Sequence, residues 1–112
     1  MKKYLIYAME GQEMCFFHAL MNAKDLMARG HEVKVIIEGA ACKLPSILVQ
    51  KGNPLFSALS QDGTIAGVCE ACSRVLGVYD ENTKLELTML SDMQGHAGMA
   101  PYVSEGYEVI VF

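Results

Sequence analysis

The stretch TIAGVCEACSRVLGV, residues 64–78, decides the fold and directs the search for a functional site. Its apolar start, residues 64–68, predicts a buried strand, and residues 70–76 predict a short helix. Cys69 would then lie between the carboxyl end of a strand and the amino end of a helix, the edge where open α/β sheets bind ligands. A helix N-terminus also favours a thiolate over a thiol. Cys69 is therefore a candidate reactive thiol, and the alternative is a buried structural cysteine.

Strand and helix patterns alternate on both sides of this stretch, which predicts an α/β fold with a mainly parallel sheet of about five strands. The 112 residues are enough for one domain, residues 1–112. The expected strands are residues 2–9, 31–37, 64–68, 88–91 and 107–112, and the expected helices are residues 14–29, 45–51, 54–60, 70–76 and 95–105, with a polar loop at 80–83.

Composition limits the classes of function. Hydrophobic residues make up 52% of the chain and charged residues 20%, an apolar excess that predicts a homo-oligomer with buried subunit interfaces. The net charge of −4, without a basic cluster, argues against nucleic-acid binding. No apolar run reaches transmembrane length, so we expect no membrane partner. Four cysteines in a core-forming composition do not suggest a secreted disulfide scaffold, and no signal peptide stands out, so we expect a cytoplasmic protein with reduced thiols.

Cys69 and Cys72 form a CxxC pair, which leaves two kinds of chemistry open besides that of a single reactive thiol. A dithiol redox pair is one, although the aromatic and Pro/Gly neighbours usual in thioredoxins are absent. A metal site is another, and it would need more ligands, for which Cys42 is a candidate on the same sheet edge. Glu38, at the end of a predicted strand, is either a solvated carboxylate or a proton acceptor beside a thiol.

The remaining histidines and cysteines carry weaker signals. His18 falls on the polar stripe of the first helix, so we interpret it as solvated. His96 precedes or opens a helix near the same edge, where capping or solvent exposure is the first interpretation and a ligand role the alternative. Cys15 falls on the apolar face of the first helix and is interpreted as a core residue. Gly11 belongs to neither a GxGxxG nor a Walker motif, so we expect no nucleotide or flavin cofactor.

Several short motifs resemble the DsrE/DsrF-like proteins, a family that includes TusD-type sulfur-relay subunits. Val68–Cys69 followed at family-like spacing by Gly77–Val78 resembles the family's cysteine segment. Ile36–Gly39 is similar to the Glu-Gly element after its second strand, and Gly106–Phe112 is similar to its closing strand. A long helix that ends at Arg29–His31 also fits, so the resemblance covers essentially the whole chain.

The resemblance implies a three-layer α/β/α domain, assembly into trimers or hexamers, and sulfur carried as a persulfide on Cys69. Such transfer needs an accessible, reactive thiolate. The chain departs from the TusD-type pattern at Cys72, where those proteins have a small residue. Cys72 is thus a candidate second thiol that releases sulfide from a Cys69 persulfide, protects Cys69, binds a metal, or only fills a small space.

The sequence therefore predicts a sulfur-transfer protein with Cys69 and Cys72 as its catalytic thiols and with Glu38, Gly39 and Cys42 as auxiliary residues of the pocket. Sulfur donor and acceptor proteins are the expected partners, and no cofactor or resident metal is expected. Two alternatives stay open. One is an oligomeric module that binds a metal or a small ligand without catalysis, and the other is a dithiol redox protein.

Overall fold

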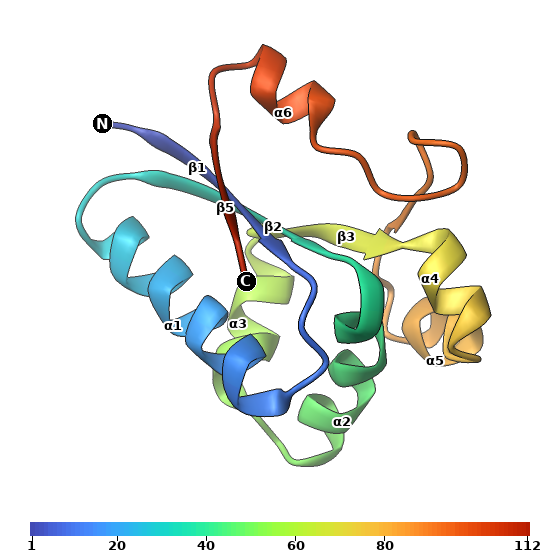
Figure 1. Cartoon of the computed structure of the whole chain (residues 1–112). Helices are drawn as coiled ribbons and strands as arrows, with labels where there is room; N and C mark the ends of the chain where they lie inside the picture. The colour runs from blue at the N-terminus through green and yellow to red at the C-terminus, as the bar shows by residue number, and fades with distance from the viewer.

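The computed structural model describes residues 1–112 and has a five-stranded parallel sheet with strand order β4-β3-β2-β1-β5 (Figure 1). The strands are β1 (Lys3–Ala8), β2 (Glu32–Ile37), β3 (Ile65–Cys69), β4 (Met89–Leu90) and β5 (Glu108–Val111). The helices are α1 (Glu13–Ala28), the 3₁₀ helix η1 (Gly39–Lys43), α2 (Leu44–Gln50), α3 (Pro54–Gln61), α4 (Glu70–Val75), α5 (Tyr79–Lys84) and α6 (Ala100–Ser104).

The predicted α/β class with a parallel sheet is confirmed, and the helices form layers on both sides of the sheet. Chain order runs β1, β2, β3, β4 toward one edge and then returns across the sheet to β5. Right-handed crossovers in the first direction place α1, α2 and α3 on one face, and the returning connection places α6 on the other. Figure 1 shows this separation, with α6 on the opposite side of the strands from α1 and α3.

The core lies between the sheet and α1. Leu5 and Ile6 in β1, and Val35–Ile37 in β2, are fully buried, because strands covered on both faces have no solvent side. Helix α1 presents four buried residues at helical spacing, Phe16, Ala19, Leu20 and Ala23. The ring of Phe16 packs against Phe56 of α3, with ring centroids 6.3 Å apart.

Two expected elements at the C-terminal half differ in the structure. Residues 80–83, predicted as a loop, lie within α5, where Asp80 and Glu81 occupy the first turn and favour a helix start. The side chain of Asn82 is buried and donates to the carbonyl of Cys42 and to Ser73 Oγ, at 3.0 and 3.1 Å. That tertiary anchor offsets the polar composition that suggested a loop.

The predicted helix 95–105 is also shorter than expected. Only Ala100–Ser104 is helical, with Pro101 in the first turn, where its missing N–H costs nothing. Gly95 has φ +91°, a conformation that a right-handed helix does not allow. The segment 91–99 is therefore free to turn across the carboxyl edge of the sheet.

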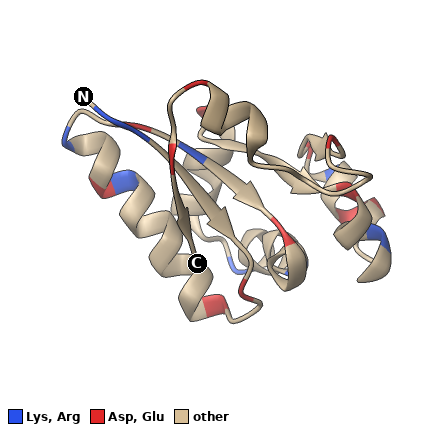
Figure 2. Cartoon of the chain, turned by 45° about the horizontal axis from the view of Figure 1, so that its top comes forward, with Lys and Arg blue, Asp and Glu red and all other residues tan.

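The predicted start of α3 is confirmed. Asn53 caps α3 by accepting a hydrogen bond from Phe56 N at 3.0 Å, and Pro54 is the first helical residue. In Figure 2, basic residues and acidic residues each occur on several elements of the chain. No helix combines the length and the apolar character needed to cross a membrane.

Candidate functional site

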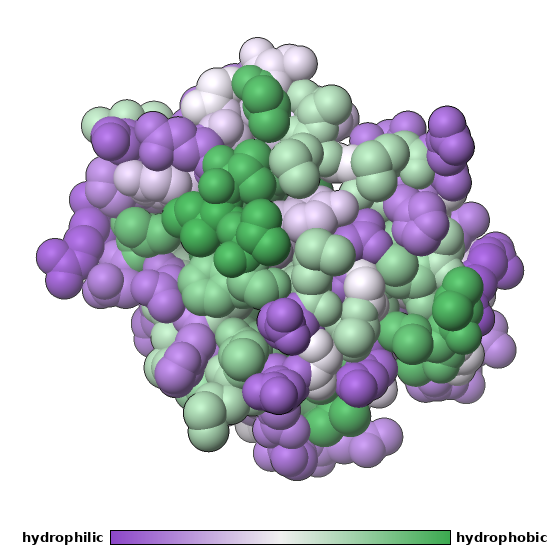
Figure 3. All heavy atoms as spheres, viewed as in Figure 1, coloured by the Kyte–Doolittle hydropathy of each residue, from purple (hydrophilic) through white to green (hydrophobic).

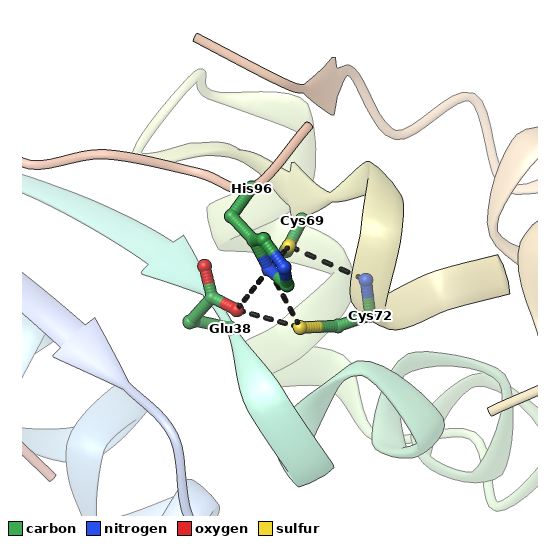
Figure 4. Close-up of side chains that lie close together, drawn as sticks. All are labelled: Glu38, Cys69, Cys72 and His96. Carbon is green, nitrogen blue, oxygen red and sulfur yellow. Dashed lines mark hydrogen bonds and ion pairs between the residues drawn. The ribbon is translucent and has the colours of Figure 1, made fainter. Parts of the chain in front are cut away.

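Four reactive side chains meet at the carboxyl edge of the sheet (Figure 4). Glu38 follows β2, Cys69 ends β3, Cys72 lies in α4, and His96 lies in the segment after β4. Since β2, β3 and β4 are parallel neighbours, the residues that follow them come together at one edge. One donor atom from each side chain lies within 4.8 Å of all the others. We call this group the edge cluster.

His96 contacts both thiols of the edge cluster. Its Nδ1 lies 3.3 Å from Cys69 Sγ and 3.5 Å from Cys72 Sγ. Cys69 is also the N-cap of α4, and its Sγ accepts a hydrogen bond from the backbone N–H of Cys72 at 3.4 Å. The sequence thus places the two thiols one helical turn apart, and the fold adds an imidazole nitrogen between them.

Glu38 is buried and held by hydrogen bonds on both carboxylate oxygens. Gly39 N donates to Oε1 at 3.0 Å, and Tyr7 OH and Ala97 N lie 3.2 Å from Oε2. Burial raises the pKa of this carboxyl, but the hydrogen bonds from Cys72, Gly39 and Tyr7 outweigh it, and the net pKa lies below its usual value. Glu38 is therefore a charged carboxylate in the interior of the site.

Cys72 donates its thiol hydrogen to this carboxylate, with Sγ 2.6 Å from Glu38 Oε1. Burial, and then the hydrogen bond to Glu38, raise the pKa of Cys72 well above that of an ordinary thiol. Burial and the Glu38 charge raise the pKa of Tyr7 in the same way, and its hydroxyl hydrogen is shared between Glu38 Oε2 at 3.2 Å and the carbonyl of Ala97 at 2.8 Å. Cys72 and Tyr7 are thus neutral donors around one fixed negative charge.

Cys42 lies beneath the edge cluster and is not part of it. Its fully buried Sγ is directed at backbone carbonyls, 3.5 Å from Ile37 O and 4.0 Å from Cys69 O. Burial raises its pKa to about 12, so at neutral pH Cys42 stays a protonated thiol that fills space in the core. The three-cysteine metal site, which the sequence left open as an alternative, therefore does not form, because Cys42 is not one of the grouped ligand residues.

Gly39 contributes its backbone rather than a side chain. Its φ of +56° turns its N–H toward Glu38, and a Cβ at this position would lie 3.3 Å from the carbonyl of Met9. The predicted Glu-Gly element is thus a positioning device for the carboxylate.

The sequence interpretation of His96 as a capping or solvated residue misses its contacts with both thiols. Its side chain is 46% exposed, so it is half in solvent while its Nδ1 lies in the site. The sequence does not indicate a role for Tyr7 either, because a tyrosine inside a β strand carries no signal of its own. Only the position of His96 just after a short strand could have suggested its role.

His18 is exposed as predicted, whereas Cys15 is half-buried rather than in the core.

The four side chains differ in how far solvent reaches them. Cys69 is fully buried, Cys72 is half-buried, and His96 is the most open. A reagent therefore meets His96 and Cys72 before Cys69. Thiol, imidazole and carboxylate together could carry out thiol exchange with a nearby base, and they are also ligands that divalent zinc accepts.

Two archaeal proteins are similar to this chain in sequence. The uncharacterized protein MJ0733 of Methanocaldococcus jannaschii is 34% identical over 93 residues, which cover 83% of this chain and 76% of that protein. An uncharacterized protein of Archaeoglobus fulgidus is 43% identical over 44 residues, 39% of this chain and 72% of that protein. No family model and no solved structure matches the chain. The extent of the first similarity shows that the chain belongs to the same family as MJ0733.

Proposed function

We propose that this chain is a DsrE/DsrF-like sulfur-transfer protein that carries sulfur as a persulfide on Cys69, with Cys72 as the second thiol. One observation carries the proposal. Cys69 Sγ lies 3.3 Å from His96 Nδ1 at the carboxyl edge of a parallel sheet, so a nucleophile and a base are in contact. The motif resemblance around Cys69 supports the same chemistry.

Sulfur loading is one exchange step. His96 Nδ1 accepts the proton of Cys69, and the thiolate attacks the outer sulfur of a donor hydropersulfide, R–S–SH. The Cys69 Sγ–S bond forms while the donor S–S bond breaks, and R–S⁻ leaves and takes up the proton. The product is a Cys69 persulfide, and no oxidant or reductant is consumed.

Unloading is the same exchange in reverse. Glu38 controls whether the sulfur goes to an acceptor or is released as HS⁻. An acceptor thiolate attacks the outer sulfur of the Cys69 persulfide and leaves Cys69 as a thiolate. If the Cys72 thiolate attacked the inner sulfur instead, a Cys69–Cys72 disulfide would form and HS⁻ would leave. Because the hydrogen bond to Glu38 keeps Cys72 a neutral thiol, transfer to the acceptor is favoured over this internal release.

The proposed partners are sulfur donor and acceptor proteins. Because Cys69 is fully buried, their reacting sulfurs reach it when the half-exposed side chain of His96 turns outward. We also propose that the protein works in the cytoplasm as a homo-oligomer, a trimer or a hexamer. Its exposed large apolar side chains, among them Val103 at 52% and Val111 at 60%, support the assembly.

Treatment with a small hydropersulfide followed by peptide mass spectrometry tests the proposal. We expect the reduced protein to gain one sulfur atom on the peptide that contains Cys69, and the Cys69→Ala variant to gain none there. Cys15→Ser is the matched control, since Cys15 is a half-buried thiol bonded only to Gln12, and it should load like the wild type. Equal sulfur uptake by Cys69→Ala and wild type would show that the role assigned to Cys69 is wrong.

A dithiol redox protein is the second candidate, and one observation favours it. The Sγ atoms of Cys69 and Cys72 are within 4.8 Å of each other, so a modest rotation of the side chains brings them to bonding distance. This function predicts a reversible Cys69–Cys72 disulfide after mild oxidation in the absence of any sulfur donor. Disulfide formation without sulfur uptake would favour the redox function over sulfur transfer.

A further inference from the structure

The edge cluster has the composition of a four-ligand metal site and holds its ligand atoms close together. It combines two thiol sulfurs, one imidazole nitrogen and one carboxylate oxygen, from Cys69, Cys72, His96 and Glu38. Zinc prefers four ligands of these types in a tetrahedral arrangement. Exposed acidic groups often cluster without a metal, but here the carboxylate and one of the sulfurs belong to fully or nearly fully buried residues.

The distances between the donor atoms are close to those around a bound zinc ion. With Zn–S of about 2.3 Å and Zn–N or Zn–O of about 2.0–2.2 Å, the edges of a tetrahedron are about 3.3–3.8 Å long. His96 Nδ1 lies 3.3 Å from Cys69 Sγ, 3.5 Å from Cys72 Sγ and 3.7 Å from Glu38 Oε1. Three of the six distances between ligand atoms therefore already fall in the range expected around zinc.

The edge between Cys72 and Glu38 is shorter than this range, and the shortening has a chemical cause. Cys72 Sγ lies 2.6 Å from Glu38 Oε1 because a thiol hydrogen bonds the two atoms. An ion that replaces this hydrogen would bind both atoms and lengthen the edge by about 1 Å, a shift that a side-chain rotation can supply. The proton of Cys72 would thus be released when the cation binds.

The carboxylate ligand is oriented before any ion binds. Gly39 N holds Oε1, and Tyr7 OH and Ala97 N hold Oε2, in the manner of the outer-shell partners that orient metal ligands. The half-exposed His96 provides the route for an ion from solvent.

We propose that Glu38, Cys69, Cys72 and His96 together bind one Zn²⁺ ion in a tetrahedral site. Binding exchanges the ion for the protons of the two thiols, two protons released when both are neutral, and oxidises nothing. The inference does not depend on sulfur transfer. Since both processes use the same sulfurs, a bound ion blocks persulfide formation on Cys69 in the same molecule.

Titration of the reduced, chelator-treated protein with Co²⁺ tests the site, followed by displacement with Zn²⁺. We expect one ion per chain, a thiolate-to-cobalt charge-transfer band and the intense visible bands of tetrahedral cobalt, all lost on addition of Zn²⁺. His96→Ala and Glu38→Gln should each lower the affinity by at least about 10-fold, because the loss of even an outer-shell partner of a metal ligand costs about 10–100-fold. Cys72→Ser should remove much of the charge-transfer band.

Two control variants change a histidine and a cysteine that lie outside the edge cluster. His18→Ala changes an exposed histidine of α1 and Cys15→Ser a half-buried thiol, and both should bind cobalt like the wild type. His96→Ala is the decisive variant, because a half-exposed side chain can be removed without loss of the fold, which circular dichroism checks. Absence of a 1:1 complex in the wild type, or unchanged affinity in His96→Ala, would overturn the proposal.

The two functional proposals can fail separately. A protein that binds cobalt with one ion per chain but gains no sulfur supports the metal site and contradicts sulfur transfer. A protein that loads sulfur on Cys69 but binds no ion contradicts the metal site alone. If both occur, one equivalent of Zn²⁺ should suppress sulfur loading in the wild type, and removal of the ion by a chelator should restore it.

Discussion

At the residue scale, Glu38 organises the site more than either cysteine does. It is 4% exposed and is contacted by Cys72, Gly39, Tyr7 and Ala97, which come from four separate segments. A buried carboxylate is costly unless hydrogen bonds compensate for lost water, and here they do so. Its charge then decides which neighbouring groups stay protonated.

Glu38 should make the stability of the protein depend on pH. Because its pKa is lower in the folded state than the ordinary value of 4.5, it stabilises the fold above that pH. This contribution is lost as the pH falls through the folded value. We expect Glu38→Gln to lower the free energy of unfolding at neutral pH by about 1–3 kcal/mol and to reduce the loss of stability in acid.

Urea unfolding followed by circular dichroism between neutral and acidic pH measures this effect. The control is Glu10→Gln, which removes an exposed carboxylate from the loop before α1. Glu10→Gln should follow the wild type at every pH. Parallel pH profiles for Glu38→Gln and wild type would contradict a stabilising charge on Glu38.

At the element scale, the close approach of β3 and β4 brings His96 into the site. Strand β4 has only two residues, and it pairs with the end of β3 through Val68 and Cys69. A Cβ on Gly67 would lie 2.5 Å from the carbonyl oxygen of Thr88 and 2.8 Å from Leu90 Cγ, so this glycine permits the approach.

Gly67→Ala should therefore separate β4 from β3. The added methyl meets backbone, which cannot move as easily as a side-chain end, and we expect a loss of about 1–3 kcal/mol in the free energy of unfolding. Urea unfolding measures this change in the free energy of unfolding. Ala66→Ser adds one atom at the neighbouring half-buried position and should cost less. Equal stability of Gly67→Ala and wild type would show that β4 is not held at this contact.

At the scale of the whole molecule, exposed apolar side chains occur on several elements, and some of them gather in patches. Figure 3 shows one hydrophobic patch over β5 beside α6 and another over α4. Val109 and Val111 pair with Leu5 and Tyr7 in β1, so both lie on one face of the edge strand β5, and Val103 lies on α6. An edge strand with exposed apolar residues readily pairs with another chain.

We expect this β5–α6 patch to form the subunit interface. Val111 is the residue to change, because its side chain is 60% exposed. Val111→Lys should shift the protein toward the 12.3 kDa monomer. Size-exclusion chromatography with light scattering gives the mass. Val75→Lys is the control, since Val75 is 83% exposed on α4, in the other patch. A wild-type monomer, or an unchanged oligomer in Val111→Lys, would contradict the interface.

The local elements were predictable where one segment carries its own signal. The apolar runs of β1 and β2, the Asn53–Pro54 start of α3 and the strand-to-helix turn at Cys69 follow from residue types at short range. Helix α5 was not predictable, because the buried hydrogen bonds of Asn82 to Cys42 and Ser73 come from distant parts of the chain.

The sequence by itself determined the α/β class, the parallel order implied by alternating strands and helices, and the CxxC pair at a strand end, because each depends on neighbours a few residues apart. Only the tertiary structure decided which residues join that pair. Glu38, Cys69 and His96 are 31 and 27 residues apart along the chain and meet because β2, β3 and β4 lie side by side. Tertiary packing likewise placed Cys42 beneath the edge cluster rather than in it, because its thiol is buried against backbone carbonyls.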